Sequence, residues 1–311
     1  MKKISIVTPT YNEDQNIEKL ILEVRKIMVS LKSKYVYEHI VIDNKSTDNT
    51  INILKKIAKE DKNLKIIINS RNFGHIRSPF YGLLQAKGDA VIFFNSDFQD
   101  PPELIPDYIK SWETGHKITL GQKTETKENF FIKYLKRTYY RLLKAISSVN
   151  LPLYATGSGI YDQKIIEQFR KIKDPYPYLR GLVAEIEDEI NFVQFVQPKR
   201  LGGKTKSNFF TFYDYVMLGL VKHSSMPLRL IIILGFISSI LSFISGLVYL
   251  FYKLLYWQSF EIGIGPLVIG MFFFFSIIIF IIGLIGEYIL SILTYSRNLP
   301  LVVEKERINF E

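Results

Sequence analysis

Two long stretches near the C-terminus hold no charged residue, and they constrain the fold more than any other feature of the sequence. Residues 230–252 and 262–286 contain no Asp, Glu, Lys or Arg. Each stretch is longer than the roughly 20 apolar residues that cross a bilayer as a helix. The short connector holds Lys253, whereas several basic residues flank the outer ends. Because cytoplasmic flanks are enriched in Lys and Arg, the pattern predicts a hairpin with both termini in the cytoplasm.

The positive charge of the chain is concentrated in two stretches outside the apolar ones. The formal net charge is +10, of which residues 122–145 contribute +5 and residues 197–222 contribute +4. Basic segments beside membrane helices attract anionic lipid headgroups, so the charge favours a membrane partner over nucleic acid. The 311 residues include no cysteine, which excludes disulfides and thiolate metal sites.

The first 120 residues alternate between short apolar runs and segments with helical apolar spacing. We expect strands at residues 4–8, 38–42, 64–69 and 90–94, with helices at 18–31, 48–60 and 77–87. This alternation is typical of an α/β domain with a Rossmann-like, mostly parallel sheet covered by helices. Neither a G-x-G-x-x-G nor a G-x-x-x-x-G-K-[ST] motif is present, which argues against a dinucleotide enzyme and a P-loop ATPase.

Polar side chains follow each expected strand directly. After the run at 90–94 come Asn95, Asp97, Gln99 and Asp100, before two prolines end the extended segment. In open α/β sheets, ligands bind at the carboxyl ends of the strands. Hard oxygen donors in this pattern suit Mg²⁺ or Mn²⁺ held together with a phosphate. Taken alone, the same pattern also fits an ordinary polar loop between a strand and a helix.

Several motifs, in this order, make the chain similar to the family 2 glycosyltransferases of the GT-A fold. The resemblance is greatest to dolichol-phosphate mannose synthase and to bacterial polyprenyl-phosphate glycosyltransferases, which carry two C-terminal membrane helices. It covers nearly the whole chain. The motifs are residues 8–13 (TPTYNE), 42–48 (IDNKSTD), 71–74 (RNFG), 96–103 (SDFQDPPE), 200–206 (RLGGKTK) and 283–288 (GLIGEY).

The resemblance implies a nucleotide-sugar donor site at the strand ends. Carboxylates there can accept hydrogen bonds from a base or a ribose hydroxyl. Asn44 occupies a position where many relatives have a second Asp, so either Asp43 or Asn44 meets the base. The implied donor residues are Pro9, Tyr11, Glu13, Asp43, Arg71, Asp97, Arg200 and Lys206.

The resemblance also implies a metal site at Asn95, Asp97 and Gln99. Relatives commonly have Asp at the first position, so Asn95 removes one negative charge, and we expect a weaker metal site. A bound Mg²⁺ or Mn²⁺ would bridge the diphosphate and offset charge on the leaving group.

For the acceptor, the resemblance implies a lipid phosphate held by Lys123, Arg137 and Arg141. Residues 130–148 have the pattern of an interfacial amphipathic helix. A phosphate monoester is already ionised at cytosolic pH, so the transfer needs no general base. The catalytic roles implied are positioning and charge stabilisation, by Asp97, Gln99, Lys123, Arg137 and Arg200.

The function implied is inverting, metal-dependent transfer of a hexose from a UDP- or GDP-sugar to undecaprenyl or another polyprenyl phosphate, for cell-envelope glycans. One alternative is a transferase that extends a sugar on a lipid diphosphate. That reaction needs a base, for which Asp97, Asp100 and Glu185 are the candidates. The other alternative is a non-catalytic nucleotide-binding subunit. Three departures from the family pattern suggest it: Asn95 in place of Asp, Lys123 in place of Arg, and no acidic residue near Ser158, where many relatives have Asp.

The expected organisation is a GT-A domain followed by membrane-associated helices, in an integral protein of the cytoplasmic membrane. Relatives suggest a homo-oligomer, with a tetramer as one form. His75, His116 and His223 are expected to be structural, and Glu287 to be interfacial or to stabilise the oligomer. The boundaries are 1–208 for the GT-A domain, 209–228 for a juxtamembrane helix, 229–296 for the hairpin (spans at about 229–252 and 266–292) and 297–311 for a cytoplasmic tail.

Overall fold

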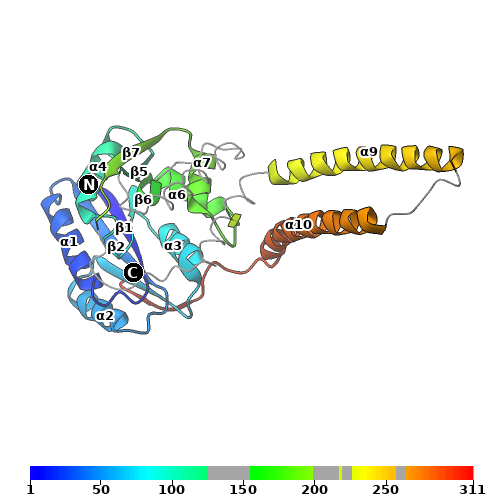
Figure 1. The fold of residues 1–311 in the computed structure, drawn as a ribbon. Coiled ribbons are helices and arrows are strands. Elements are labelled where there is room, and N and C mark those ends of the chain that lie inside the picture. The colour runs from blue at the N-terminus through cyan, green and yellow to red at the C-terminus, as the bar shows by residue number, and fades with distance from the viewer. Residues whose placement is uncertain (125–154, 199–216, 219–225, 257–263, 311) are drawn as a thin grey trace.

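The computed structural model describes residues 1–124, 155–198, 217–218, 226–256 and 264–310 (Figure 1). Strands and helices alternate through the first range, as the sequence predicts. In chain order the elements are β1 (Lys2–Thr10), α1 (Ile17–Ser30), β2 (Tyr35–Asp43), α2 (Thr50–Glu60), β3 (Leu64–Asn69), α3 (Gly74–Leu84), β4 (Ala90–Phe93), the 3₁₀ helix η1 (Pro102–Leu104), α4 (Ile105–Glu113), β5 (Ile118–Lys123), β6 (Ala155–Asp162), α6 (Gln163–Lys171), α7 (Leu179–Ile186), β7 (Ile190–Phe195), α9 (Met226–Leu255), α10 (Ile264–Ser296) and β8 (Glu304–Ile308).

The strands form one sheet in the order β7-β5-β6-β4-β1-β2-β3-β8. The pairs β1–β2, β1–β4, β2–β3 and β5–β7 are parallel, whereas β6 and β8 are antiparallel to their neighbours. Since β4 and β5 both oppose β6, strands β1 to β5 and β7 all run in one direction. Their last residues therefore lie at one end of the sheet, called here its carboxyl end. A mostly parallel α/β sheet is confirmed.

Helices cover both faces of this sheet and create two apolar layers (Figure 1). Along β1, Ile4 and Ile6 pack into the layer that includes α1, α2 and α4, whereas Val7 packs into the layer with α3 and α6. These side chains are fully buried. The alternation follows from the two-residue period of a strand, and it explains why central strands appear in the sequence as continuous apolar runs.

The residues after α10 return to the sheet. Strand β8 pairs antiparallel with β3, with Ile308 opposite Ile66 and Arg307 opposite Ile67. Sequence analysis treated 297–311 as a tail separate from the domain. The structure instead makes its central part the edge strand that covers β3, and Asn309 Nδ2 donates to Leu64 O (2.8 Å) beyond the strand.

Side chains also fasten this C-terminal segment to α3 and α2. Arg77 Nε donates to Leu301 O (2.8 Å), and Tyr81 Oη donates to Glu304 (2.8 Å). Lys55 forms an ion pair with Glu306 (2.6 Å). Helix α3 is thus held by the segment that follows α10.

Helices α9 and α10 extend away from the domain on one side (Figure 1). Within the described residues, one stretch, Ile277–Ser296 of α10, is long and apolar enough to cross a membrane by length and composition. In α9, Leu228–Ile237 forms a shorter apolar stretch. The two helices correspond to the two expected spans. The interfacial helix expected at 130–148 and most of the juxtamembrane helix expected at 209–228 lie outside the described residues.

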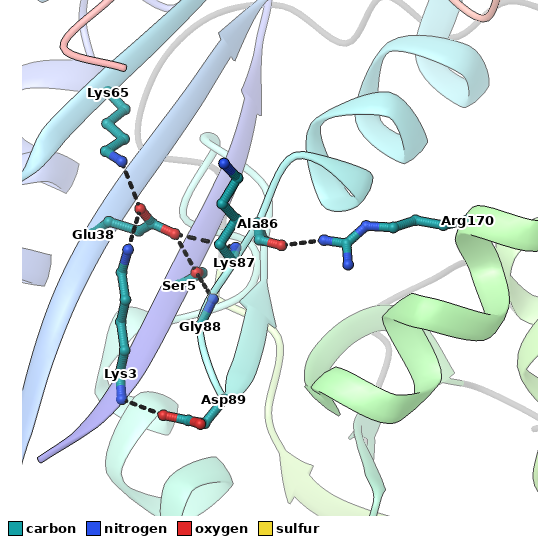
Figure 2. A network of polar contacts seen from close by, with 9 residues as sticks. All are labelled: Lys3, Ser5, Glu38, Lys65, Ala86, Lys87, Gly88, Asp89 and Arg170. Carbon is teal, nitrogen blue, oxygen red and sulfur yellow. Dashed lines mark hydrogen bonds and ion pairs between the residues drawn. The ribbon is translucent and has the colours of Figure 1, made fainter. Parts of the chain in front are cut away.

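A buried carboxylate stabilises the opposite, amino end of the sheet (Figure 2). Glu38, only 3% exposed, accepts hydrogen bonds from Lys3 Nζ (2.7 Å) and Ser5 Oγ (2.6 Å) and pairs with Lys65 (2.8 Å). Burial acts to raise the pKa of Glu38, but these partners outweigh it and lower the pKa to about 2. This network lies away from the strand ends at which sequence analysis places the ligand site.

Candidate active site

The loops that follow β1 and β2 are joined by hydrogen bonds at the carboxyl end of the sheet. Asn12 N donates to Ser46 Oγ (2.8 Å), and Thr47 N donates to Asn12 Oδ1 (2.7 Å). Asn12 has a positive φ of 54°, which Asn tolerates better than most residues. Pro9 and Tyr11, on either side of Thr10, are partly exposed at this end, whereas Glu13 is buried and accepts from Asn16 Nδ2 (2.7 Å).

Asp43 is fully buried at the end of β2. Its two carboxylate oxygens accept from the backbone and the hydroxyl of Ser46, at 2.8 and 2.5 Å. Burial raises the pKa of Asp43, and the hydrogen bonds from Ser46 oppose that effect. In this structure Asp43 shapes the β2–α2 loop, and its expected contact with a nucleotide base stays a prediction.

Asn44 connects this loop to the loop after β3. Its Oδ1 accepts from Phe73 N (2.8 Å) and Asn69 Nδ2 (3.2 Å), while its Nδ2 donates to Asn72 Oδ1 (2.9 Å) and Gly74 O (3.0 Å). The side chain is 7% exposed. Asn44 therefore uses both amide atoms to hold residues 69–74. The nearby Arg71 is exposed, with its guanidinium 4.6 Å from the centre of the Phe73 ring.

The loop after β4 brings the expected metal residues together in a strained turn. Asp97 Oδ1 accepts from Gln99 N (3.1 Å), and the intervening Phe98 has a positive φ of 58°. A bulky residue rarely adopts this conformation, and such strain is concentrated at functional sites. Phe98 is nevertheless 6% exposed and packs in the apolar layer with α1 and α4. The buried ring anchors the turn, while Asn95, Asp97 and Gln99 remain partly exposed.

Asp100 lies beneath this turn and is 4% exposed. Its Oδ2 accepts from Ser158 Oγ (2.6 Å) and from Asn95 Nδ2 (3.1 Å). Ser158 comes from β6, which is paired with β4. Burial raises the pKa of the neighbouring Tyr108 hydroxyl, and the Asp100 charge raises it further. The sequence suggested Asp100 as one of the oxygen donors after β4 and as a candidate base, but its contact with Asn95 was not predicted.

Lys123, expected at the acceptor phosphate, is the last residue of β5 and thus lies at the same end of the sheet. The described chain leaves this end at Thr124 and re-enters it at Ala155, the first residue of β6. Strand β7 also ends there, at Phe195. The remaining expected site residues lie outside the described residues, namely Arg137, Arg141, Arg200 and Lys206.

Other residues singled out in the sequence lie in varied surroundings. His116 Nδ1 contacts Thr114 Oγ1 (3.0 Å) and Ser111 O (3.2 Å) near the amino end of β5, away from the site. Sequence analysis did not single out His39, a buried histidine whose Nε2 is 3.0 Å from Thr8 Oγ1. Burial lowers the pKa of His39 to about 3, so it is neutral and structural. Glu185, in α7, is exposed, and His223 lies outside the described residues.

The donor atoms at the β4 turn fit a hard divalent cation. Asp97 supplies a carboxylate, and Asn95 and Gln99 supply amide oxygens, which Mg²⁺ and Mn²⁺ accept as ligands. The described residues contain no group of three or more His, Cys, Asp or Glu side chains that could hold a metal. Of the three ligands that this turn would supply, one is charged and two are neutral, which leaves positions for a phosphate.

Comparisons with known proteins identify the family. Residues 5–170 match the Glycosyl transferase family 2 domain. An uncharacterised glycosyltransferase of Bacillus subtilis (strain 168) is 31% identical over 308 residues, covering 99% of this chain and 94% of that protein. A bactoprenol glucosyl transferase of Shigella phage SfV is 27% identical, covering 97% of this chain and 98% of its own length.

Among solved structures, the fold is similar to that of glucosyl-3-phosphoglycerate synthase from Mycobacterium tuberculosis. That structure, in complex with Mn²⁺, UDP-glucose and phosphoglyceric acid, has a TM-score of 0.50 and 20% identity, covering 71% of this chain and 78% of the other. The sequence match extends over more than half of the chain, and the sheet has the expected GT-A-like architecture. The chain belongs to glycosyl transferase family 2.

Proposed function

We propose that this glycosyltransferase transfers a hexose from a nucleotide-sugar to a polyprenyl phosphate at the cytoplasmic face of a membrane, with inversion at the anomeric carbon. The observation that carries the proposal is that the sequence similarity to a bactoprenol glucosyl transferase extends through the C-terminal helices α9 and α10. The bactoprenol glucosyl transferase of phage SfV aligns with 97% of this chain, well beyond the family 2 domain that ends at residue 170. The similarity therefore extends over both the catalytic sheet and the C-terminal helices, which supports a lipid acceptor.

The return of β8 to the sheet supports the proposed topology. Strands β1 and β8 belong to the same sheet, so the chain before α9 and the chain after α10 are on the same side of any membrane. Two crossings, by α9 and α10, satisfy this requirement. Lys and Arg residues at the outer ends of the hairpin favour the cytoplasm for that side.

The donor would bind across the carboxyl ends of β1 to β4. Pro9, Tyr11 and Arg71 present partly or fully exposed surface there, and the Asn44 and Ser46 hydrogen bonds fix the loops that carry them. Glu13 and Asp43 are buried at the same strand ends and are proposed to accept hydrogen bonds from the base or the ribose. Arg200 and Lys206, on the segment after β7, are proposed to neutralise the diphosphate.

Asn95, Asp97 and Gln99 would hold a divalent cation that bridges the diphosphate and offsets charge on the leaving nucleoside diphosphate. The Mn²⁺ and UDP-glucose bound to the mycobacterial synthase make this pairing reasonable for a GT-A fold. Asp97 supplies the negative ligand. The turn built on Phe98 keeps its carboxylate in place, because Asp97 Oδ1 is already oriented by Gln99 N.

Lys123, Arg137 and Arg141 are proposed to hold the acceptor phosphate. Lys123 is at the carboxyl end of β5, two strands from β4. Arg137 and Arg141 lie on a segment whose two described ends, Thr124 and Ala155, are at this end of the sheet. Their charges would reduce repulsion between the acceptor phosphate and the donor diphosphate, and no general base is required for an ionised phosphate.

A substitution at Asp97 tests this proposal. The full chain in detergent, given radiolabelled UDP- and GDP-hexoses, Mn²⁺ and undecaprenyl phosphate, should form labelled lipid. Asp97→Asn should reduce transfer at least about a hundredfold, because it removes the carboxylate from the proposed metal site. Asp107→Asn, in the first turn of α4, is the matched control and should retain activity. Normal transfer by Asp97→Asn would refute the metal site.

A further inference from the structure

The Asn95–Asp100 contact has a consequence for how the proposed cation is bound. We propose that Asp100 is a positioning residue that holds the Asn95 amide with its oxygen available to the divalent cation. The inference rests on the metal-dependent function proposed above. It concerns a residue that does not itself touch the cation.

The first step is the direction of the hydrogen bond. The atom of Asn95 that faces Asp100 Oδ2, at 3.1 Å, is Nδ2. A carboxylate oxygen accepts and does not donate, so the opposite orientation of the amide would place two acceptors against each other. Because the amide group is planar, its Oδ1 points away from Asp100. The carboxylate thereby selects one of the two amide orientations.

The second step is that Asp100 is itself firmly held. The Ser158 hydroxyl donates to the same Oδ2 at 2.6 Å, from a strand that pairs with β4. Asp100 is 4% exposed, which leaves its side chain little freedom to move. A partner that orients a metal ligand has to be fixed in this way, and such partners commonly change metal affinity 10- to 100-fold.

The third step is that a purely structural role does not account for Asp100, because burial of its carboxylate lowers the stability of the fold. Its second oxygen, Oδ1, is buried and accepts no hydrogen bond from the described residues. A buried carboxylate with an unsatisfied oxygen destabilises a fold, so its presence calls for an explanation other than packing. Orientation of Asn95, two residues before Asp97, supplies one.

The neutral side chain at position 95 fits the same account. A carboxylate at this position would oppose Asp100 at hydrogen-bonding distance, and two like charges so close repel. An amide instead satisfies Asp100 with its nitrogen and keeps an oxygen for the cation. The pair therefore provides one oxygen ligand, from Asn95, and one negative charge, on the Asp100 carboxylate that accepts from the same amide.

Mn²⁺ binding to the full-length protein in detergent, with UDP present, tests the proposal. Electron paramagnetic resonance of free Mn²⁺ gives the dissociation constant without any transfer reaction. Asp100→Ala should weaken Mn²⁺ binding about tenfold or more. Asp100→Asn should stay within about threefold of the natural protein, because its amide oxygen still accepts from Asn95 and preserves the orientation.

Two further variants separate positioning from general damage. Asn95→Ala combined with Asp100→Ala should bind Mn²⁺ no more weakly than Asn95→Ala alone, since both changes interrupt one interaction. Asp162→Ala is the matched control. Asp162 also accepts two hydrogen bonds, from Trp112 Nε1 (2.8 Å) and Lys164 N (2.9 Å). It is the last residue of β6 and lies opposite Ala90, at the amino end of β4 and away from the proposed cation, so Mn²⁺ affinity should not change.

Three results would overturn the inference: unchanged Mn²⁺ affinity in Asp100→Ala, additive losses in the double variant, or an equal loss in Asp162→Ala. Failure of the proposed function would look different. If the natural protein transfers sugar and binds Mn²⁺ but Asp100→Ala does so equally well, the positioning role is wrong and the function stands. If the natural protein transfers sugar without binding Mn²⁺, both the metal dependence and the positioning role are wrong. If it binds Mn²⁺ with the expected effects of the variants but transfers no sugar, the proposed function fails and the positioning role stands.

Discussion

Replacement of Asn44 tests how the donor site is assembled. Four hydrogen bonds converge on this one side chain, two accepted by Oδ1 and two donated by Nδ2, and the side chain is 7% exposed. A buried hydrogen bond contributes about 0.5–1.5 kcal/mol, and bonds that share one group are not additive. Asn44→Ala should therefore lower the free energy of unfolding by about 2–4 kcal/mol.

The same substitution should weaken nucleotide binding through the loop that Asn44 holds. Without Asn44, Phe73 N and Gly74 O lose their partner, so the backbone that positions Arg71 is less ordered. Asn44→Asp should also destabilise the protein, because a carboxylate accepts from Phe73 N but cannot donate to Asn72 Oδ1 and Gly74 O. The dissociation constant for UDP should rise about tenfold or more in Asn44→Ala.

Equilibrium urea unfolding in detergent, followed by tryptophan fluorescence, measures the stability, and calorimetry with UDP measures binding. Asn52→Ala is the matched control. Asn52 makes one exposed hydrogen bond, to Asn49 Oδ1 (2.9 Å), so its loss should change the free energy of unfolding by less than about 0.5 kcal/mol. A loss below about 1 kcal/mol in Asn44→Ala, with unchanged UDP affinity, would refute the reasoning.

Three further predictions concern the sheet and the acceptor. Removal of residues 299–311 should expose the edge of β3, lower the melting temperature and promote aggregation. An added peptide with the sequence of residues 299–311 should restore stability, whereas an unchanged melting temperature would show that β8 is dispensable. The pKa of Glu38 is about 2 in the folded protein against an ordinary 4.5, so ionised Glu38 contributes about 3 kcal/mol to the free energy of unfolding above pH 4.5, and this contribution is lost as the pH falls toward 2. Glu38→Gln should therefore lose less stability than the natural protein between pH 4.5 and pH 2, and an equal loss in both proteins would contradict this. Lys123→Ala should raise the KM for polyprenyl phosphate about ten- to a hundredfold with little change for the donor, whereas Lys123→Arg should be tolerated; a raised KM for the donor instead would place Lys123 in the donor site.

The central sheet could be predicted from the sequence because its signals are local. The runs that became β1 to β4 are apolar on both faces, and each ends in a polar cluster. The expected strand at residues 64–69 coincides with β3, and the expected helix at 48–60 with most of α2. The position of the ligand site then followed from the shared direction of parallel strands.

Strand β8 could not be predicted in the same way. Its alternating Glu304, Lys305, Glu306 and Arg307 contain no apolar period, and its partner β3 lies more than 200 residues earlier in the chain. Pairing depends on backbone hydrogen bonds and on the ion pair with Lys55, neither of which appears in a hydropathy pattern. Helices α9 and α10 lie between the rest of the sheet and this strand, so only tertiary structure reveals the pairing.

For the site, the sequence predicted which strand ends carry the candidate residues, but not which hydrogen bonds these residues form. Sequence analysis left open whether Asp43 or Asn44 meets the base, and the structure shows both buried and engaged in loop contacts. Helix α3 begins at Gly74 rather than at the expected residue 77. At this start, Gly74 N donates a hydrogen bond to Asn72 Oδ1 (2.8 Å). These hydrogen bonds join loops distant in sequence, which composition and spacing do not encode.

The identity of the lipid product tests the central claim most directly. The full chain should be incubated with a nucleotide-hexose panel, Mn²⁺ and either undecaprenyl phosphate or a lipid-diphosphate-linked sugar, and the lipids analysed by mass spectrometry. The account predicts a polyprenyl monophosphate that has gained one hexose, formed only with the monophosphate acceptor. A disaccharide on the lipid diphosphate, or nucleotide binding without any product across the panel, would contradict it.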